Sequence, residues 1–297
     1  MKTGHPVRSG NESGKTLIVG GDGKVGRALA LHLSQAGQPT IVTSRRPSTE
    51  SAVPLDLAED VSGWPIPEGI SVAIVCAAIP LMDLCEKDPQ GTARVNVLGT
   101  LALIERLVAS DVFTVFLSTN QVFDGQTPRV PPDSPQSPRS EYGCQKTRVE
   151  QALFGLGDRA AIVRFGKIIE PGTPLFRGWR DALVSGGTIT PFVDMWMAPI
   201  PLSTTVSILR LIADRQLGGI WQVSGERDVT YADVATRLAA QLKVPPEQVR
   251  PIAAKESGRV TSHLARHTTL CVDRLQREFG IQPPPVDWTV QATFESL

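Results

Sequence analysis

The sequence predicts an α/β protein with a doubly wound, mostly parallel sheet and a smaller C-terminal lobe. Three observations support this fold class. The apolar run at residues 17–19 ends in a glycine-rich turn and is followed by an amphipathic stretch, which indicates strand, turn and helix. Further apolar runs alternate with helical patterns up to about residue 166, as is typical of parallel sheets. Beyond Pro171 the alternation becomes irregular, which indicates a second lobe.

The elements follow in order along the chain. Residues 1–14 are polar and lack the apolar segment of a signal peptide, so we predict a flexible tail. A nucleotide-binding domain is expected over residues 15–166 with a late strand near 219–224, and residues 167–297 are assigned mostly to a substrate-binding lobe. The predicted strands are residues 17–19, 40–43, 72–76, 112–117, 160–165 and 219–224, and the predicted helices are 25–36, 94–109, 142–153, 231–242 and a short one within 268–280.

The composition of the chain excludes several functional classes of protein. Hydrophobic residues make up 41% of the 297-residue chain, and 30 basic residues balance 30 acidic ones. A nucleic-acid or membrane-surface protein usually carries a basic excess, so we expect neither partner. The four cysteines form no C-x-x-C pair and do not cluster with the four histidines, so we expect no metal, no disulfides and a cytoplasmic setting. No apolar run reaches the roughly 20 residues of a membrane span.

The turn after the first predicted strand contains three glycines, Gly20, Gly23 and Gly26, spaced three apart. A tight turn, a close approach of the backbone to a diphosphate and close helix packing each exclude a side chain. Lys24 and Val25 begin the following helix, whose free N–H groups favour phosphate oxygens. This placement predicts a dinucleotide-binding domain of the Rossmann type.

The second predicted strand ends in Ser44, Arg45 and Arg46. An acidic residue at this position is typical of NAD binding, because it contacts the ribose hydroxyls. Two guanidinium groups instead favour the additional phosphate of NADP, which they can bind with paired hydrogen bonds. The alternative is a pair of solvated surface arginines.

Other residues near predicted strand ends are candidates for cofactor contacts. Asp56, beside Leu57, either accepts a hydrogen bond from an adenine amino group or caps the next turn. Ala77 and Ala78 are small enough for a cofactor to lie across the strand end. Asn96 either contacts the cofactor or ties neighbouring backbone groups together.

The most informative stretch runs from residue 118 to residue 146. Ser118 and Thr119 end a predicted strand, and Tyr142 and Lys146 lie four apart on a predicted helix, so their side chains share one face. We expect the ammonium to lower the pKa of the phenol and a hydroxyl of the strand end to hold a substrate carbonyl. The alternative is a partly buried tyrosine with a solvated lysine.

A loop over residues 127–138 contains five prolines, which exclude a helix or a central strand. It is either a stiff connector or a flap over the substrate.

Taken together, these residues resemble the extended short-chain dehydrogenase/reductase family, and within it the branch similar to dTDP-4-dehydrorhamnose reductases. The similarity spans roughly residues 16–290. It is carried by Gly20-Gly21-Asp22-Gly23-Lys24-Val25-Gly26, Asp83-Leu84-Cys85-Glu86 with Pro89, Arg94-Val95-Asn96-Val97-Leu98-Gly99-Thr100, Ser118-Thr119 with Val122-Phe123-Asp124-Gly125, Tyr142-Gly143 with Lys146, residues 219–224, and Val272-Asp273-Arg274-Leu275.

The resemblance implies a two-lobed fold and NAD(P)H-dependent reduction of a keto group on a nucleotide-linked sugar. Tyr142 would be the general acid, Thr119 would hold the carbonyl oxygen, and Lys146 would bind ribose hydroxyls of the nicotinamide. Phe165 and Gly166 would line the nicotinamide pocket. NADP(H) is the preferred cofactor and NAD(H) the second choice. Whether the chain forms a homodimer is left open.

The chain departs from the pattern of this branch at three positions near the substrate. Asn120 replaces the usual acid, Gln121 replaces the usual aromatic residue, and Ser140 replaces a common asparagine. The departures imply either a different substrate or a loss of activity. Two alternatives therefore remain: a cofactor-binding regulatory subunit, like the beta subunit of methionine adenosyltransferase in the same branch, and an epimerase or dehydratase.

The segment at residues 255–268 lacks the arginine-proline pattern of the branch, so we expect its contacts with a nucleotide-linked sugar to differ from those of the branch. Three residues in it are candidates for new contacts or for a solvated face, namely His263, Arg266 and His267.

Overall fold

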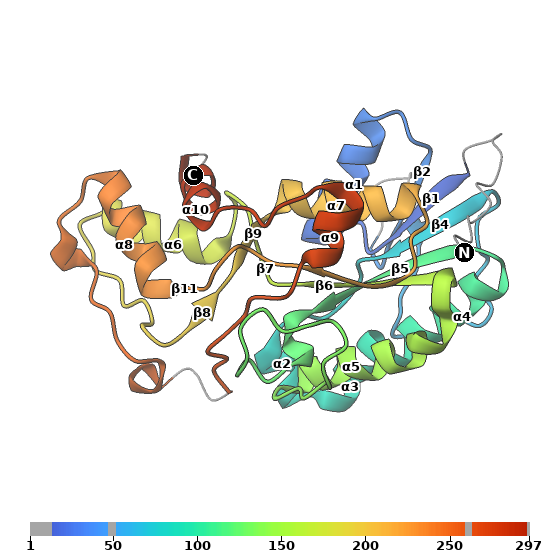
Figure 1. The fold of residues 1–297 in the computed structure, drawn as a ribbon, viewed down its shortest axis with the longest axis horizontal. Helices are drawn as coiled ribbons and strands as arrows, with labels where there is room; N and C mark the ends of the chain where they lie inside the picture. The colour runs from blue at the N-terminus through green and yellow to red at the C-terminus, as the bar shows by residue number, and fades with distance from the viewer. Residues whose placement is uncertain (1–13, 47–51, 259–262, 296–297) are drawn as a thin grey trace.

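The computed structural model describes residues 14–46, 52–258 and 263–295 (Figure 1). Its centre is a seven-stranded sheet in the order β10-β6-β5-β4-β1-β2-β3, in which every neighbouring pair is parallel. This confirms the predicted fold class. The strands are β1 (Lys15–Val19), β2 (Thr40–Ser44), β3 (Ala52–Pro54), β4 (Ile70–Val75), β5 (Phe113–Thr119), β6 (Ala160–Phe165) and β10 (Gly219–Val223).

Helices cover both faces of this sheet, as Figure 1 shows. One face packs against α1 (Lys24–Gln35), α7 (Leu202–Asp214) and α9 (Asp273–Phe279), and the other against α4 (Thr100–Ala109) and α5 (Glu141–Leu153). The central strands are buried on both sides, which explains why they read as continuous apolar runs. Burial of these two apolar layers therefore fixes where the strands end.

Local signals set the ends of several helices. The Ser140 hydroxyl accepts a hydrogen bond from the backbone N–H of Gly143 and caps α5. Thr230 and Asp233 form a reciprocal capping box at the start of α8 (Tyr231–Leu242), which begins and ends at the predicted residues. Gly280 ends α9 with a φ of 67°.

A second group of elements lies at the opposite end of the molecule from the sheet (Figure 1). It contains α6 (Pro174–Val184), α8 and α10 (Val286–Glu295), with the short strands β8 (Trp196–Met197) and β11 (Val229–Thr230). These elements have their own apolar core, in which the rings of Phe176, Trp179 and Phe294 pack together. The pair of β7 (Lys167–Ile169) and β9 (Pro199–Pro201) follows the end of β6.

The sequence prediction and the structure differ in several helices. Residues 94–109 form a π-helical segment, Arg94–Gly99, before α4 begins, instead of one continuous helix. Helices α6, α7 and α10 were not predicted, and neither were the short helices α2 (Met82–Lys87) and α3 (Pro89–Ala93). The helix expected within residues 268–280 is present as α9, which covers only part of that range. Within the described ranges, no helix is long and apolar enough to cross a membrane, and no His, Cys, Asp or Glu cluster suits a metal.

Two glycines within helical segments provide a matched test of this packing. A Cβ atom on Gly99 would lie 1.9 Å from the Leu57 carbonyl oxygen, whereas a Cβ on Gly178 of α6 meets nothing within 4 Å. We expect Gly99→Ala to lower the free energy of unfolding by about 1–3 kcal/mol, because backbone must move. Gly178→Ala should raise it by about 0.5–1 kcal/mol through helix propensity. Urea denaturation of both variants checks this, and equal effects would contradict the packing at Gly99.

Candidate active site

Two cavities lie side by side at the carboxyl edge of the sheet. The larger, of about 520 Å³, is lined by Pro80 to Asp83, by the end of β5 and by the second lobe. The smaller, of about 190 Å³, is lined by the glycine turn after β1, the end of β2 and residues 76–79. Ile79 lines the smaller cavity and the next residue, Pro80, lines the larger one, so the two cavities are neighbours. In open α/β sheets this edge is where ligands bind.

Tyr142 lies on the wall of the larger cavity in the first turn of α5. Lys146, one turn later, is 3% exposed, and its Nζ donates a 2.8 Å hydrogen bond to the Leu117 carbonyl oxygen. The same Nζ lies 4.4 Å from the ring centroid of Phe116 and 5.9 Å from that of Tyr142. Phenol and ammonium therefore share one helix face, as predicted, with the lysine beneath the tyrosine rather than solvated.

The predicted lowering of the tyrosine pKa is wrong for this structure. Burial raises the pKa of Tyr142 above its usual value, and the nearby Cys85 acts in the same direction. The Lys146 ammonium does not offset this effect, since it is directed to the Leu117 carbonyl. Burial also lowers the pKa of Lys146 to about 8, against the opposing influence of Glu150. Tyr142 is therefore a neutral hydroxyl at neutral pH, in the protonation state of a proton donor.

Thr119, Asn120 and Gln121 line the same cavity at the end of β5. The Thr119 hydroxyl accepts a hydrogen bond from the Gln121 backbone N–H at 3.2 Å and donates one to Asn120 Oδ1 at 3.3 Å. The Asn120 amide in turn donates to the Thr268 carbonyl oxygen at 3.4 Å. Polar side chains from the sheet edge and a segment near residue 268 thus form one wall of the cavity.

The glycine turn beside the smaller cavity is packed too closely for side chains at two of its positions. A Cβ atom on Gly20 would lie 2.7 Å from the Cα of Ala77, and a Cβ on Gly26 would lie 2.3 Å from the Gly20 carbonyl oxygen. Gly23 starts α1 with no side-chain cap, which leaves N–H groups of the first turn without a side-chain partner. Gly20, Gly23, Leu57, Ala77 and Ala78 all line this cavity, as a dinucleotide site requires.

The two arginines after β2 are not equivalent. Both side chains are exposed, but Arg45 lines the smaller cavity and Arg46 does not. Lys24, at the start of α1, forms a 3.3 Å ion pair with Glu170.

The remaining predicted cofactor residues support the site without lining the smaller cavity. Asp56 Oδ1 accepts from the Ala58 N–H and caps a turn. Asn96 is 1% exposed and bonds both the N–H and the carbonyl of Ile79, so it ties backbone groups together. Gly166 lines the larger cavity, while Val25 and Phe165 pack in the core. The Ser118 hydroxyl donates to buried Glu150.

Sequence reasoning missed the far wall of the larger cavity. Four large side chains of the second lobe form it, namely Phe192, Met195, Trp196 and Tyr231. No periodic signal in the sequence linked these positions to the site. His263 also lines this cavity and its Nε2 lies 3.0 Å from the Asp124 carbonyl oxygen. Arg266 is exposed, and His267 Nδ1 lies 3.5 Å from Asp228 Oδ2.

The proline-rich loop does not line the larger cavity. Ser134, Pro135 and Ser137 instead line a neighbouring cavity of about 250 Å³, which they share with residues 267–270. The loop is bonded to the protein beneath it, so it acts as a connector rather than a flap.

Three of the four cysteines lie on or near the helix α5 that carries Tyr142 and Lys146. Burial raises the pKa of Cys76 to about 12, and it also raises the pKa values of Cys85 and Cys144 above the usual thiol value. Cys85 Sγ donates a 3.4 Å hydrogen bond to the Ile79 carbonyl oxygen. All four cysteines are free thiols.

The fold and the glycine-lined cavity define a protein of the dinucleotide-binding α/β class, with a larger second cavity beside the first. The model of the RmlD substrate-binding domain family matches residues 14–297. The chain therefore belongs to this family, within the extended short-chain dehydrogenase/reductases, which confirms the resemblance stated from the motifs.

Relatives of known name fall into two functional groups. The chain is 25% identical over 261 residues to the mouse (Mus musculus) methionine adenosyltransferase 2 subunit beta, covering 81% of this chain and 75% of that protein. It is 25% identical over 252 residues to a dTDP-4-dehydrorhamnose reductase of Mycolicibacterium smegmatis, covering 82% and 74%. The structure of dTDP-4-dehydrorhamnose reductase from Bacillus anthracis in complex with NADP has the same fold, with a TM-score of 0.83 and 18% identity over 96% of this chain and all of that one.

The lowered pKa of Lys146 predicts a pH dependence of stability. Between pH about 8 and 10.5 the unfolded chain holds the lysine proton more tightly than the native protein does. The free energy of unfolding of the wild type should therefore rise with pH across this window, relative to Lys146→Met, by on the order of a few kcal/mol. Urea titrations of both proteins at several pH values measure the difference, and parallel curves would contradict the burial of a titrating lysine.

Proposed function

We propose that this protein is an NADPH-dependent reductase that converts a keto group of a nucleotide-linked sugar, or of a related carbonyl compound, to an alcohol. The observation that supports it is the meeting of Tyr142 and Thr119 on one wall of the 520 Å³ cavity, directly beside the glycine-lined cavity. A ketone held there has a proton donor and a hydroxyl within one site. The family, which includes named reductases, agrees with this chemistry.

Each residue has a defined role in the proposal. The Thr119 hydroxyl would hold the carbonyl oxygen, and the neutral Tyr142 hydroxyl would give its proton to that oxygen as it gains charge. Lys146, buried and charged below pH about 8, would stabilise the phenolate that remains and bind ribose hydroxyls. When bound, NADPH supplies the hydride.

The smaller cavity suits NADP(H). Gly20 and Gly23 line it, so the backbone of the glycine turn would face a diphosphate, and Arg45 of the same lining would contact the additional phosphate of NADP. The Bacillus anthracis reductase of the same fold was solved with NADP, which supports the choice. NAD(H) remains the second choice.

One observation favours a second candidate function. Asn120 and Gln121, the two residues that depart from the reductase pattern, lie on the cavity wall, and the chain resembles a regulatory subunit over 81% of its length. Affinity purification from the native host separates the two functions. A stoichiometric enzyme whose kinetics change on binding would support a regulatory subunit, and turnover by the protein alone would support the reductase.

The chain has two tyrosines, and both lie on the wall of the larger cavity. We expect Tyr142→Phe to lower kcat for NADPH-dependent reduction by about 100-fold or more, because the proton donor is lost. Tyr231→Phe removes a hydroxyl from the same cavity without removing the donor, so its effect should fall on KM. Steady-state kinetics with a panel of 4-keto nucleotide sugars and simple ketones measures both. Similar kcat losses in the two variants would contradict the assignment.

The arginines after β2 allow a test of cofactor choice. Arg45→Ala should weaken NADPH binding about tenfold or more and leave NADH binding nearly unchanged, because it removes a charge-assisted contact to the phosphate. Arg46→Ala should have a smaller effect, since its side chain does not line the cavity. Fluorescence titration with both cofactors gives the four affinities. If Arg45→Ala lowers the affinities for NADPH and NADH equally, this residue does not recognise the additional phosphate.

A further inference from the structure

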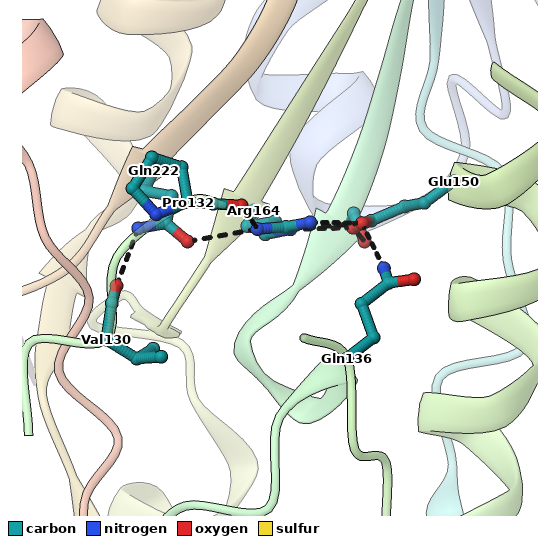
Figure 2. Close-up of polar contacts among 7 residues, drawn as sticks. Val130, Pro132, Gln136, Glu150, Arg164 and Gln222 are labelled. Carbon is teal, nitrogen blue, oxygen red and sulfur yellow. Dashed lines mark hydrogen bonds and ion pairs between the residues drawn. The ribbon is translucent and has the colours of Figure 1, made fainter. Parts of the chain in front are cut away.

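A charged pair that the proposed chemistry does not use lies buried beneath the site. Glu150 is 0% exposed, and its carboxylate contacts Arg164, which is 1% exposed, at 2.6 Å. Arg164 Nε also lies 3.0 Å from both carboxylate oxygens. Ser118 Oγ and Gln136 Nε2 donate to the two remaining positions, so the carboxylate is fully hydrogen-bonded (Figure 2).

This pair joins four parts of the chain that meet at the site. Glu150 belongs to α5, Ser118 to the end of β5, and Arg164 to β6. Arg164 also donates to the Pro132 carbonyl oxygen at 2.8 Å, which, with the bond from Gln136, fastens the proline-rich loop. Figure 2 shows Arg164 between Glu150 on one side and Gln222 on the other. Gln222 extends the network to the carbonyls of Val130 and Cys271.

The spacing on α5 relates the pair to the site. Glu150 follows Lys146 by four residues and Tyr142 by eight, so the three side chains occupy one face of the helix at successive turns. The proline-rich loop, fastened at Gln136, enters α5 at Ser140, which caps the helix. The first three turns of α5 are therefore held at both ends, by the cap and by Glu150.

Stability alone does not account for a buried pair of charges. Replacing a buried ion pair with well-packed apolar side chains is often neutral or stabilising, because the cost of desolvation is removed. What an apolar pair cannot supply is a fixed negative charge one helical turn from a buried ammonium. The titratable groups that face Lys146 are Glu150 and Tyr142 on its own helix, Cys76 at the end of β4 and Cys85 on α2. Of these, Glu150 is the carboxylate.

We infer that Glu150, held by Arg164, is a positioning residue for Lys146. It fastens the helix that carries Tyr142 and Lys146 to the strand end that carries Thr119, and it keeps the buried ammonium charged at the pH where the site works. The importance of this inference for catalysis rests on the proposed function. The effect of Glu150 on the charge of Lys146 can be measured without turnover.

The first measurement is the titration of Lys146, followed by NMR in protein labelled with ¹³C at the lysine ε position and assigned with Lys146→Arg. In the wild type the midpoint should lie near the pKa of about 8. Glu150→Gln keeps the shape of the side chain and removes its charge, so the midpoint should fall by about one pH unit or more. An unchanged midpoint overturns the inference.

The second variant separates the charge from packing. Glu150→Leu combined with Arg164→Met removes both charges and fills the space with apolar groups, so its melting temperature should recover relative to Glu150→Gln. We expect the Lys146 midpoint to stay low in this double variant, and the alkaline limb of kcat/KM to move to lower pH with it. A double variant with recovered stability and the wild-type midpoint would show that the pair is only structural, and would overturn the inference.

Failure of the proposed function gives a different result. If the wild type turns over no carbonyl compound with NADPH while Glu150→Gln still lowers the Lys146 midpoint, the reductase proposal fails. The charge relation between Glu150 and Lys146 is then supported.

Discussion

The hydrogen bond from Lys146 Nζ to the Leu117 carbonyl oxygen joins helix α5 to strand β5 just before that strand ends. Thr119 lies two residues beyond Leu117, and Tyr142 lies one helical turn before Lys146. Together with the bond from Ser118 to Glu150, this contact fixes the position of Tyr142 relative to the Thr119 hydroxyl. The contact is possible because a lysine is buried at 3% exposure, and a buried ammonium requires acceptors and negative charge around it. The polar network beneath α5 meets that requirement.

The unusual residues of the site fit this architecture. Asn120 accepts from Thr119 and donates to the Thr268 carbonyl oxygen, so it needs both an acceptor and a donor. A carboxylate at this position would bring two acceptors together at Thr268. Ser140 serves as the cap of α5 through its contact with Gly143. Asn120 thus forms part of a hydrogen-bonded wall between the sheet edge and the segment near residue 268, and Ser140 has a structural role at the start of α5.

The sequence predicted the features that depend on neighbouring residues and missed those that depend on residues far away in the chain. The glycine turn and helix α8 were predicted correctly, because turn geometry and the Thr230–Asp233 capping box are set by neighbouring residues. The direction of the Tyr142 pKa was predicted wrongly, because burial by distant segments outweighs a lysine four residues away. The partners of Glu150 lie 14 and 32 residues along the chain, so no local pattern revealed the buried pair. The aromatic far wall was missed for the same reason.

The thiols around α5 have a chemical consequence. A cysteine attacks electrophiles and peroxides as its thiolate, and a raised pKa keeps that form scarce at neutral pH. Cys76, Cys85 and Cys144 all have raised pKa values, and Cys85 is also hydrogen-bonded within the fold. Burial therefore keeps the cysteines around the helix that carries Tyr142 mostly as neutral thiols at neutral pH, the form that is the weaker nucleophile.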